Sequence, residues 1–195
     1  MRSAEFDREQ VLRSAIDAFI DKGYTKTSMQ DLKAATGLHP GSIYCAFESK
    51  KGLMLAAIAQ YDKDKSEEFA ALFEGKKAIL EGIRNYLKCT VMSVSSECAG
   101  NHRACLTQKA LSEVGADEPE IAAAIKASMT RWQCGFVKVF EQALGNGEIS
   151  DSRSPEQRMQ SLVMGIFGLR TFAQTQRDPE LLNALAEQLF EDVCR

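Results

Sequence analysis

Apolar residues recur at helical spacing along almost the whole chain, and no segment alternates convincingly between apolar and polar residues as a strand would. In the first segment, for example, Val11, Ala15 and Phe19 fall on one side of a helix. The apolar stripes predict about nine helices, at residues 6–22, 28–36, 40–47, 49–73, 76–96, 102–113, 117–144, 154–172 and 178–193. The pattern therefore predicts an all-α fold.

Residues that favour helix ends separate the first, short helices. Gly23 suits a left-handed C-cap after the first helix, and Thr27 with Gln30 has the spacing of a capping box. Gly37 permits a tight turn, and Pro40 suits the first position of the third helix, where its missing N–H is not needed. Two short helices joined by a glycine turn match the helix-turn-helix motif.

Composition places the chain among ordinary globular proteins. It has 195 residues, of which 45% are hydrophobic and 26% charged, and a formal net charge of −3. Disordered chains have fewer apolar residues and more net charge. No apolar run reaches the roughly 18 residues of a membrane-spanning helix, and Met1 to Gln10 lacks the apolar region of a secretory signal. We therefore expect a cytoplasmic protein without membrane contact, whose six scattered cysteines are free thiols.

Positive charge gathers around the predicted helix-turn-helix. Residues 22–51 carry five lysines and two acidic residues, a net charge of +3, so the rest of the chain carries −6. Duplex DNA is a dense line of negative charge, so this distribution favours DNA binding by an acidic protein. The alternative from the pattern alone is two helices of an ordinary bundle with a solvated lysine face.

The segment G-L-H-P-G-S-I-Y-C-A-F-E-S-K-K-G-L, Gly37 to Leu53, resembles the signature of the TetR family of bacterial repressors. The matching positions are Gly37, Gly41, Tyr44, Phe47, Ser49, Lys50 and Leu53. The upstream segment from Gly23 to Leu32 is similar too, and the resemblance covers residues 6–55. It implies a DNA-binding domain at 1–52, a larger effector-binding and dimerisation domain at 53–195, and a repressor that releases a palindromic operator when an effector binds.

Several residues of the motif are candidates for DNA contact. A helix-turn-helix places its second helix in the major groove, while the helix N-termini approach phosphates. The predicted DNA-binding residues are Thr27, Ser28, His39, Pro40, Gly41, Ser42, Tyr44, Cys45 and Lys50. Thr27, Ser28 and His39 have capping as an alternative or additional role. Because residues 40–47 contain no Lys or Arg, we expect apolar contact with thymine methyl groups rather than guanine recognition by Arg.

The resemblance further implies a homodimer formed by the last two helices and an effector pocket between residues 76 and 177. The predicted dimer residues are Gly165, Ile166, Leu169, Ala173 and Leu185. The predicted pocket residues are Met92, Cys105, Trp132, Phe136 and Phe167, which favour an apolar or aromatic small molecule. The alternatives are a stable monomer and plain core packing at these positions.

Cys105 supports a second hypothesis. The segment A-C-L-T-Q-K resembles the start of a helix in family members that sense electrophiles or oxidants through a cysteine there. A location near His102, Arg103 and a helix N-terminus favours a lowered thiol pKa, and the alternative is that Cys105 is a small buried hydrophobic residue. Cys98, His102 and Cys105 have metal-ligand spacing but lack a fourth ligand, so no metal site is predicted. No cofactor motif or catalytic arrangement stands out, so we expect no enzyme. A helical ligand carrier without DNA binding is the remaining alternative.

Overall fold

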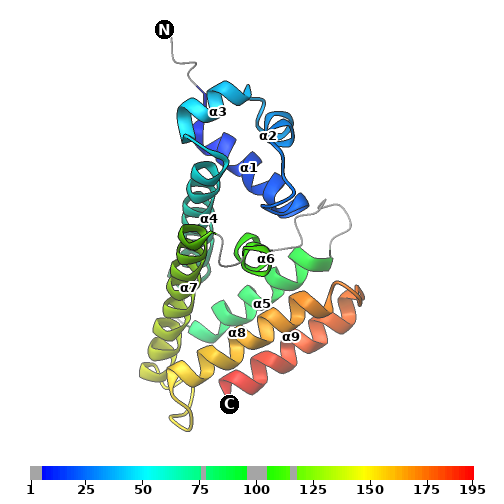
Figure 1. Ribbon diagram of the computed structural model, residues 1–195. Coiled ribbons are helices and arrows are strands. Elements are labelled where there is room, and N and C mark those ends of the chain that lie inside the picture. The colour runs from blue at the N-terminus through cyan, green and yellow to red at the C-terminus, as the bar shows by residue number, and fades with distance from the viewer. Residues whose placement is uncertain (1–5, 76–77, 96–104, 115–117) are drawn as a thin grey trace. The chain divides into compact units, whose positions relative to one another are not determined.

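The computed structural model describes residues 6–75, 78–95, 105–114 and 118–195. Over these residues the chain forms nine helices and no strand (Figure 1). Their bounds are α1 Arg8–Lys22, α2 Met29–Thr36, α3 Pro40–Phe47, α4 Lys50–Phe73, α5 Ile79–Ser95, α6 Leu106–Glu113, α7 Pro119–Gly145, α8 Pro155–Phe172 and α9 Pro179–Cys194. The predicted all-α class is confirmed.

The ends of the short helices follow the predicted signals, with one correction. Gly23 ends α1 with φ 83° and Gly37 ends α2 with φ 70°, both in conformations that favour glycine. The predicted capping box of Thr27 and Gln30 is wrong, because the box of α2 uses Ser28 and Asp31. The Thr27 hydroxyl is buried and donates to the Gly23 carbonyl at 2.6 Å, so the cap moves one residue along.

The chain divides into two compact units. Unit 1 comprises residues 1–65 and 104–129, and unit 2 comprises residues 66–103 and 130–195. The core of unit 1 joins α1, α2, α3 and the first part of α4 to α6 and the start of α7 through buried aliphatic side chains and two phenylalanines. Packing therefore groups the chain differently from the expected functional division after residue 52, which stays a prediction.

Unit 2 is built around α5, α8 and α9, which pack side by side (Figure 1). Its core contains the aliphatic stripes of these helices together with Phe136 and Phe140 of α7. Arg158 of α8 is fully buried and donates to the carbonyls of Val193 and Ser150, which ties the end of α9 to the turn before α8. Among the described residues no helix is long and apolar enough to cross a membrane.

Candidate nucleic-acid interface

The helix-turn-helix is held in place by three buried side chains. Leu32 of α2 and Ile43 of α3 are fully inaccessible, and Phe47 is 5% exposed. They enter the core of unit 1, whose apolar burial stabilises one orientation of α3. Since Ile43 and Phe47 lie one helical turn apart, they fix which face of α3 turns inward.

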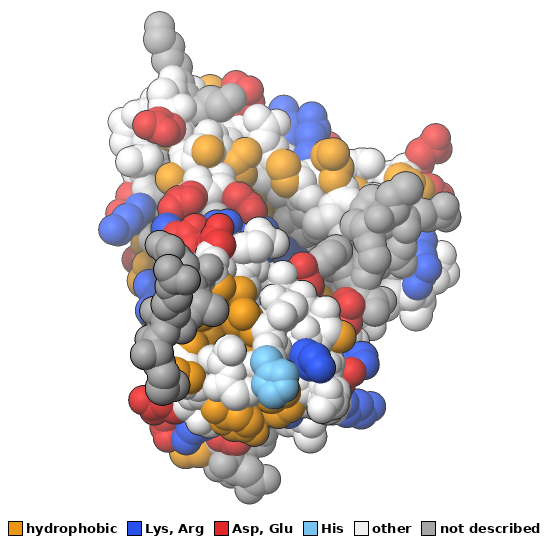
Figure 2. All heavy atoms as spheres, turned by 90° about the horizontal axis from the view of Figure 1, so that it is seen from above, with side chains coloured by type: hydrophobic (Ala, Val, Ile, Leu, Met, Phe, Trp, Pro, Cys, Tyr) orange, Lys and Arg blue, Asp and Glu red, His pale blue; other side chains and the backbone are white. Residues whose placement is uncertain are grey.

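The opposite face of α3 is open to solvent. His39, Gly41, Tyr44 and Cys45 are exposed, while Pro40 and Ser42 are partly exposed. We call these six residues the recognition face. Figure 2 shows hydrophobic and basic side chains gathered beside a histidine on the surface seen from above. The His39 side chain caps α3, as its Nδ1 accepts a hydrogen bond from the Gly41 amide at 3.3 Å.

Two exposed lysines, Lys26 before α2 and Lys33 within it, were absent from the predicted set of contacts. Neither Lys26 nor Lys33 has an ion pair or hydrogen bond with another described residue. Lys22, by contrast, pairs with Asp31 at 2.5 Å, and this bond holds the pKa of the Asp31 carboxyl well below its usual range. The excess of positive charge in residues 22–51 indicated that some lysines of this segment contact DNA. The sequence does not show which of them are paired with acidic residues, so Lys26 and Lys33 were not singled out.

Lys50 and Thr27 are less accessible than expected of phosphate ligands. The Lys50 ammonium donates to the Thr25 carbonyl at 3.3 Å and lies 4.7 Å from the centre of the Tyr24 ring. Burial lowers its pKa. One donor of the ammonium is engaged, which leaves two for a phosphate. The Thr27 hydroxyl is occupied inside unit 1. Ser28 is exposed at the start of α2, but its hydroxyl donates to the Asp31 carboxylate at 2.6 Å, so a phosphate would have to take the place of that carboxylate as its acceptor.

The predicted pocket residues do not gather in one place. Trp132, Phe136 and Phe167 lie together in unit 2, with ring centroids 5.5 Å and 5.9 Å from Trp132 to the other two. Met92 is 68% exposed on α5, and Cys105 belongs to unit 1. The aromatic cluster of unit 2 therefore includes only three of the five.

Sequence reasoning missed two members of this cluster. Phe69 and Tyr86 each have a ring centroid 5.0 Å from that of Phe136, in an edge-to-face arrangement. The Tyr86 hydroxyl accepts a hydrogen bond from Trp132 Nε1 at 2.9 Å. A buried indole N–H generally has such a partner, so Trp132 was the available signal that a polar side chain lay nearby.

Cys105 occupies the N-cap position of α6 and is partly exposed. The Tyr61 hydroxyl of α4 donates to its Sγ at 3.3 Å, and Thr107 Oγ1 lies 3.0 Å from the same sulfur. Cys105 thus has one hydroxyl donor, from Tyr61, and a position at a helix N-terminus. The other two members of the metal alternative, Cys98 and His102, lie outside the described residues, and no cluster of metal ligands occurs in the part of the chain that the structure describes.

Most of the predicted dimer residues pack within their own chain. Ile166, Leu169 and Ala173 are at most 6% exposed and belong to the core of unit 2. A Cβ built on Gly165 would lie 2.4 Å from Leu189 methyl carbons of α9. Ile166, Leu169 and Ala173 therefore offer little surface to a second copy, while Gly165 is partly exposed and packs against Leu189, so the dimer assignment stays a prediction.

Another face of α8 and α9 is open instead. Met164 and Phe172 of α8 and Leu181 of α9 are exposed, Gly168 meets no atom within 4 Å of an added Cβ, and Leu185 is partly exposed. Met164, Gly168 and Phe172 follow each other at intervals of four residues, so they share one side of α8. We call these five residues the α8–α9 stripe.

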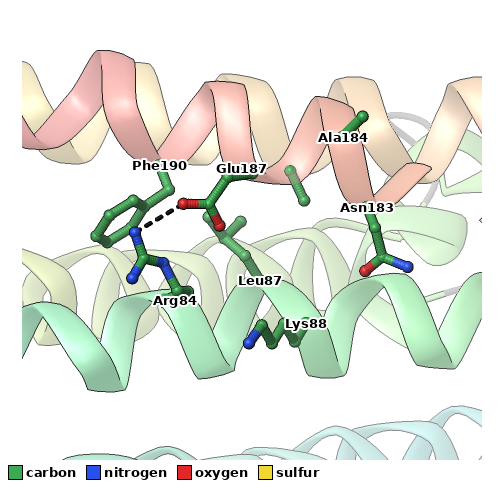
Figure 3. Close-up of a pocket in the computed structure, with 8 residues that line it drawn as sticks. Arg84, Leu87, Lys88, Asn183, Ala184, Glu187 and Phe190 are labelled. Atoms are coloured by element: carbon green, nitrogen blue, oxygen red, sulfur yellow. Dashed lines mark hydrogen bonds and ion pairs between the residues drawn. The ribbon is translucent and has the colours of Figure 1, made fainter. Parts of the chain in front are cut away.

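A groove of about 400 Å³ runs between α5 and α9 (Figure 3). Its floor is apolar, with Leu87 and Phe190, and the Arg84–Glu187 ion pair at 2.7 Å crosses it. The Arg84 guanidinium also lies 4.2 Å from the centre of the Phe190 ring. The positive charge of Arg84 is therefore already paired, and the groove is a seam between two packed helices.

Two family models match the chain. The model of bacterial regulatory proteins of the tetR family matches residues 11–57, which contain α2 and α3. The model of the tetracyclin repressor-like C-terminal domain matches residues 81–189, more than half of the chain. The first match contains the recognition face, and the second contains every member of the aromatic cluster except Phe69.

Relatives and solved structures agree with these models. The chain is 24% identical to the transcriptional regulator AcuR of Cereibacter sphaeroides, over 93% of this chain and 82% of that protein. It is 26% identical to the transcriptional repressor ComR of Escherichia coli, over 76% and 70%. A cysteine-substituted variant of the TetR-family regulator CifR, complexed with 26-base-pair operator DNA, is 26% identical with a TM-score of 0.86, over 97% and 98%.

Proposed function

Because this chain belongs to the TetR family of bacterial regulatory proteins, and so is a DNA-binding transcriptional regulator rather than an enzyme, we propose that it is a repressor. It binds a palindromic operator as a homodimer in the cytoplasm and releases it when an effector acts on residues 53–195. Residues 1–52 bind the DNA. The relatives ComR, a repressor, and CifR, a regulator bound to operator DNA, support this proposal.

The recognition face carries the proposal. It is an open surface of α3 without charged side chains, and it is accompanied by Lys26 just before α2 and Lys33 on α2. Phosphate contacts position a protein on DNA, and contacts with base edges select the sequence. We assign Lys26, Lys33, Ser28, Lys50 and the Tyr44 hydroxyl to phosphates. Pro40, Gly41, Ser42 and Cys45 face base edges and His39 lies beside them.

Selection of sites from a random duplex pool, followed by a salt series, tests this assignment. We expect an enriched palindrome, and the Lys33→Ala variant should weaken binding to every duplex and reduce the slope of log K against log salt by about 1. Ser42→Ala should change the preferred sequence more than the affinity. Lys138→Ala, on an exposed position of unit 2, is the matched control. Equal slopes for all three variants would contradict the phosphate role of Lys33.

The α8–α9 stripe is the proposed dimer interface. It offers three exposed large side chains beside a glycine, which allows close approach of a second helix. Contiguous exposed apolar surface of this kind marks interaction sites. A two-fold dimer places two recognition helices about 34–36 Å apart, one turn of B-DNA, which explains the expected palindrome.

Sedimentation of two methionine variants tests the interface. Met164→Asp puts a charge on the stripe and should convert dimers to monomers at micromolar concentration, because an unpaired buried charge opposes association. Met92→Asp changes an equally exposed methionine of α5 in the same unit and should leave the dimer intact. A dimer that survives Met164→Asp would refute this interface.

The aromatic cluster of unit 2 is the proposed place of effector action. Trp132, Phe136 and Phe167 with Phe69 and Tyr86 present aromatic faces and edges, which favour an apolar or aromatic molecule. Met92 is exposed on the same helix as Tyr86 and stays a candidate for the outer wall.

Trp132 is the only tryptophan of the chain, so its fluorescence reports on this cluster. A panel of small aromatic compounds should contain at least one that changes Trp132 emission and releases operator DNA over the same concentration range. Tyr86→Phe removes the hydroxyl that accepts from Trp132 and should shift the emission without effector. Operator release without any change in emission would place the effector elsewhere.

The contacts of Cys105 favour a second candidate, a repressor released by electrophiles. The thiolate adds to the β-carbon of an α,β-unsaturated carbonyl compound, a carbon–sulfur bond forms, and the proton lost by the thiol ends on the α-carbon. The Tyr61 hydroxyl, 3.3 Å from Sγ, stabilises the thiolate before the addition.

N-ethylmaleimide tests this candidate. All proteins carry Cys45→Ser, because alkylation of the exposed Cys45 on the recognition face would itself block DNA. In this background the reagent should modify Cys105 and release the operator, while Cys105→Ser should stay bound and Cys134→Ser, an exposed control in unit 2, should respond like the parent. Unchanged release from Cys105→Ser would exclude the thiol as the sensor.

A further inference from the structure

Lys109 of α6 reaches the end of α1. Its ammonium donates to the carbonyl of Ile20, and to the carbonyl of Asp21 at 3.1 Å. Both carbonyls belong to the last turn of α1, where backbone acceptors lack intrahelical donors. A cation at this end also interacts favourably with the helix dipole. Lys109 therefore serves as a C-terminal cap of α1 that comes from a distant part of the chain.

The same end of α1 meets α6 a second time. A Cβ built on Gly23 would lie 2.2 Å from the Glu113 carboxylate, so backbone and side chain are in close contact there. The Gly23 carbonyl also accepts a hydrogen bond from the Thr27 hydroxyl. Residues 23–28 connect this point to Ser28, the N-cap of α2. The position of α6 thus sets where the chain leaves α1 and enters the helix-turn-helix.

The other end of α6 is attached to α4. Cys105, its N-cap, accepts a hydrogen bond from Tyr61 of α4, and Lys109 lies four residues later, one turn along α6. Buried side chains of α6, Leu106 and Ala110, pack in the core of unit 1. The helix is short and held at both ends, so a displacement of Cys105 is transmitted to Lys109.

We propose that Lys109 is a positioning residue for operator binding, which couples α6 to the helix-turn-helix by holding the last turn of α1. This inference rests on the proposed DNA-binding function and adds a residue that touches no DNA. Loss of the contact lets residues 23–28 and α2 vary in position. This should weaken binding to the operator, which needs α3 in one position, more than binding to a random duplex. The lysines assigned to phosphates are unchanged when the Lys109 contact is lost, so binding to a random duplex should be kept.

Three variants test the inference by DNA binding. Lys109→Met keeps the length of the side chain without its donors, Lys109→Arg restores a cation with donors, and Lys138→Met is the control on an exposed position of α7. We expect Lys109→Met to bind the operator about tenfold more weakly than wild type, because hydrogen bonds from a charged donor are lost. Its affinity for a random duplex should stay within about twofold of wild type. Lys109→Arg should recover most of the affinity. Unchanged operator affinity, or equal loss on both duplexes, would overturn the inference.

Hydrogen exchange of the free protein gives a readout without DNA. Amides of residues 23–28 should exchange roughly tenfold faster in Lys109→Met than in wild type, while the amides of α8 should not change. Equal exchange at 23–28 would overturn the positioning role even if no operator is found, whereas failure of wild type alone to select an operator would count against the proposed function. Lys109→Gln, which keeps a shorter donor, replaces the methionine variant if that protein does not fold.

Discussion

In unit 1 exposed and partly buried polar contacts link short helices at their ends, whereas in unit 2 longer helices pack through aromatic and aliphatic side chains around one buried polar centre, Arg158. Unit 1 contains the Ser28 capping box, the Lys109 contact with α1 and the Arg13–Asp64 ion pair. Unit 2 contains the cluster around Phe136. Polar contacts are directional and set the position of a backbone, while apolar packing is broad and tolerates different side chains.

This difference matches the two proposed tasks. A helix-turn-helix must present α3 to a fixed DNA lattice, so small shifts at Gly23 or Ser28 reduce binding. An effector site has to accept a particular molecule, and aromatic surfaces supply area without fixing one direction. Substitutions in the two units should therefore differ in kind as well as in size.

The largest loss of stability should come from the core of unit 2. Phe136→Ala removes a fully buried ring that touches three other aromatic side chains, and it should lower the free energy of unfolding by about 3–5 kcal/mol. Urea unfolding measures this loss, and Lys138→Ala at the surface of the same helix should cost less than about 0.5 kcal/mol. A loss below about 1 kcal/mol at Phe136 would show that the cluster is loosely packed.

The next largest effect should be a backbone effect in unit 1. Gly23 has φ 83° and ψ 156°, a region that other residues enter only under strain. Gly23→Ala should therefore cost about 1–3 kcal/mol in urea unfolding and weaken operator binding as well. Gly145→Ala is the matched control, because Gly145 lies within α7, has no positive φ and has no atom within 4 Å of an added Cβ. Equal stability of Gly23→Ala and Gly145→Ala would show that the backbone conformation of Gly23 does not require glycine.

An acid-sensitive contact should distinguish unit 1 further. Both Arg13 Nε and Nη2 donate to Asp64 at 2.9 Å, and this guanidinium is the main cause of the lowered pKa of the Asp64 carboxyl. A lowered pKa means that the carboxylate stabilises the folded state above about pH 4 and loses that contribution as the pH falls through the folded-state pKa. Because Asp64 is partly exposed, we expect about 1 kcal/mol or less.

Urea unfolding at pH 7 and pH 3 measures this contribution. Wild-type protein should lose more stability on acidification than Asp64→Asn, which has no carboxyl group to protonate. Identical pH dependence of the two proteins would show that the ion pair does not stabilise unit 1.

The smallest effect should come from the ion pair across the groove of unit 2. Arg84 and Glu187 are each 44% exposed, so solvent screens their attraction. Glu187→Gln should change the free energy of unfolding by less than about 0.5 kcal/mol, and 1 M salt should abolish the difference. A larger effect in the urea titration would mean that unit 2 depends on this exposed ion pair as well as on the buried Arg158.

The sequence by itself determined the helices, most of their ends and the family, although the cap of α2 lies one residue beyond the predicted one. Gly23, Gly37 and Pro40 act on neighbouring residues, and Ser154 and Gln157 form the capping box at the start of α8. Such interactions span at most a few residues, so the order of residues specifies them. The motif from Gly37 to Leu53 is equally local, which is why the regulator class was predictable.

Only the tertiary structure decided which side of a helix faces inward and which distant residues meet. The helix α8 carries apolar residues on several sides, so the pattern could not show that Ile166 is buried while Met164 is exposed. Likewise Lys109 and Ile20 are 89 residues apart, and their contact arises because α6 packs in the core of unit 1. Burial is a competition among all apolar faces of the chain, and its outcome depends on the complete set of neighbours.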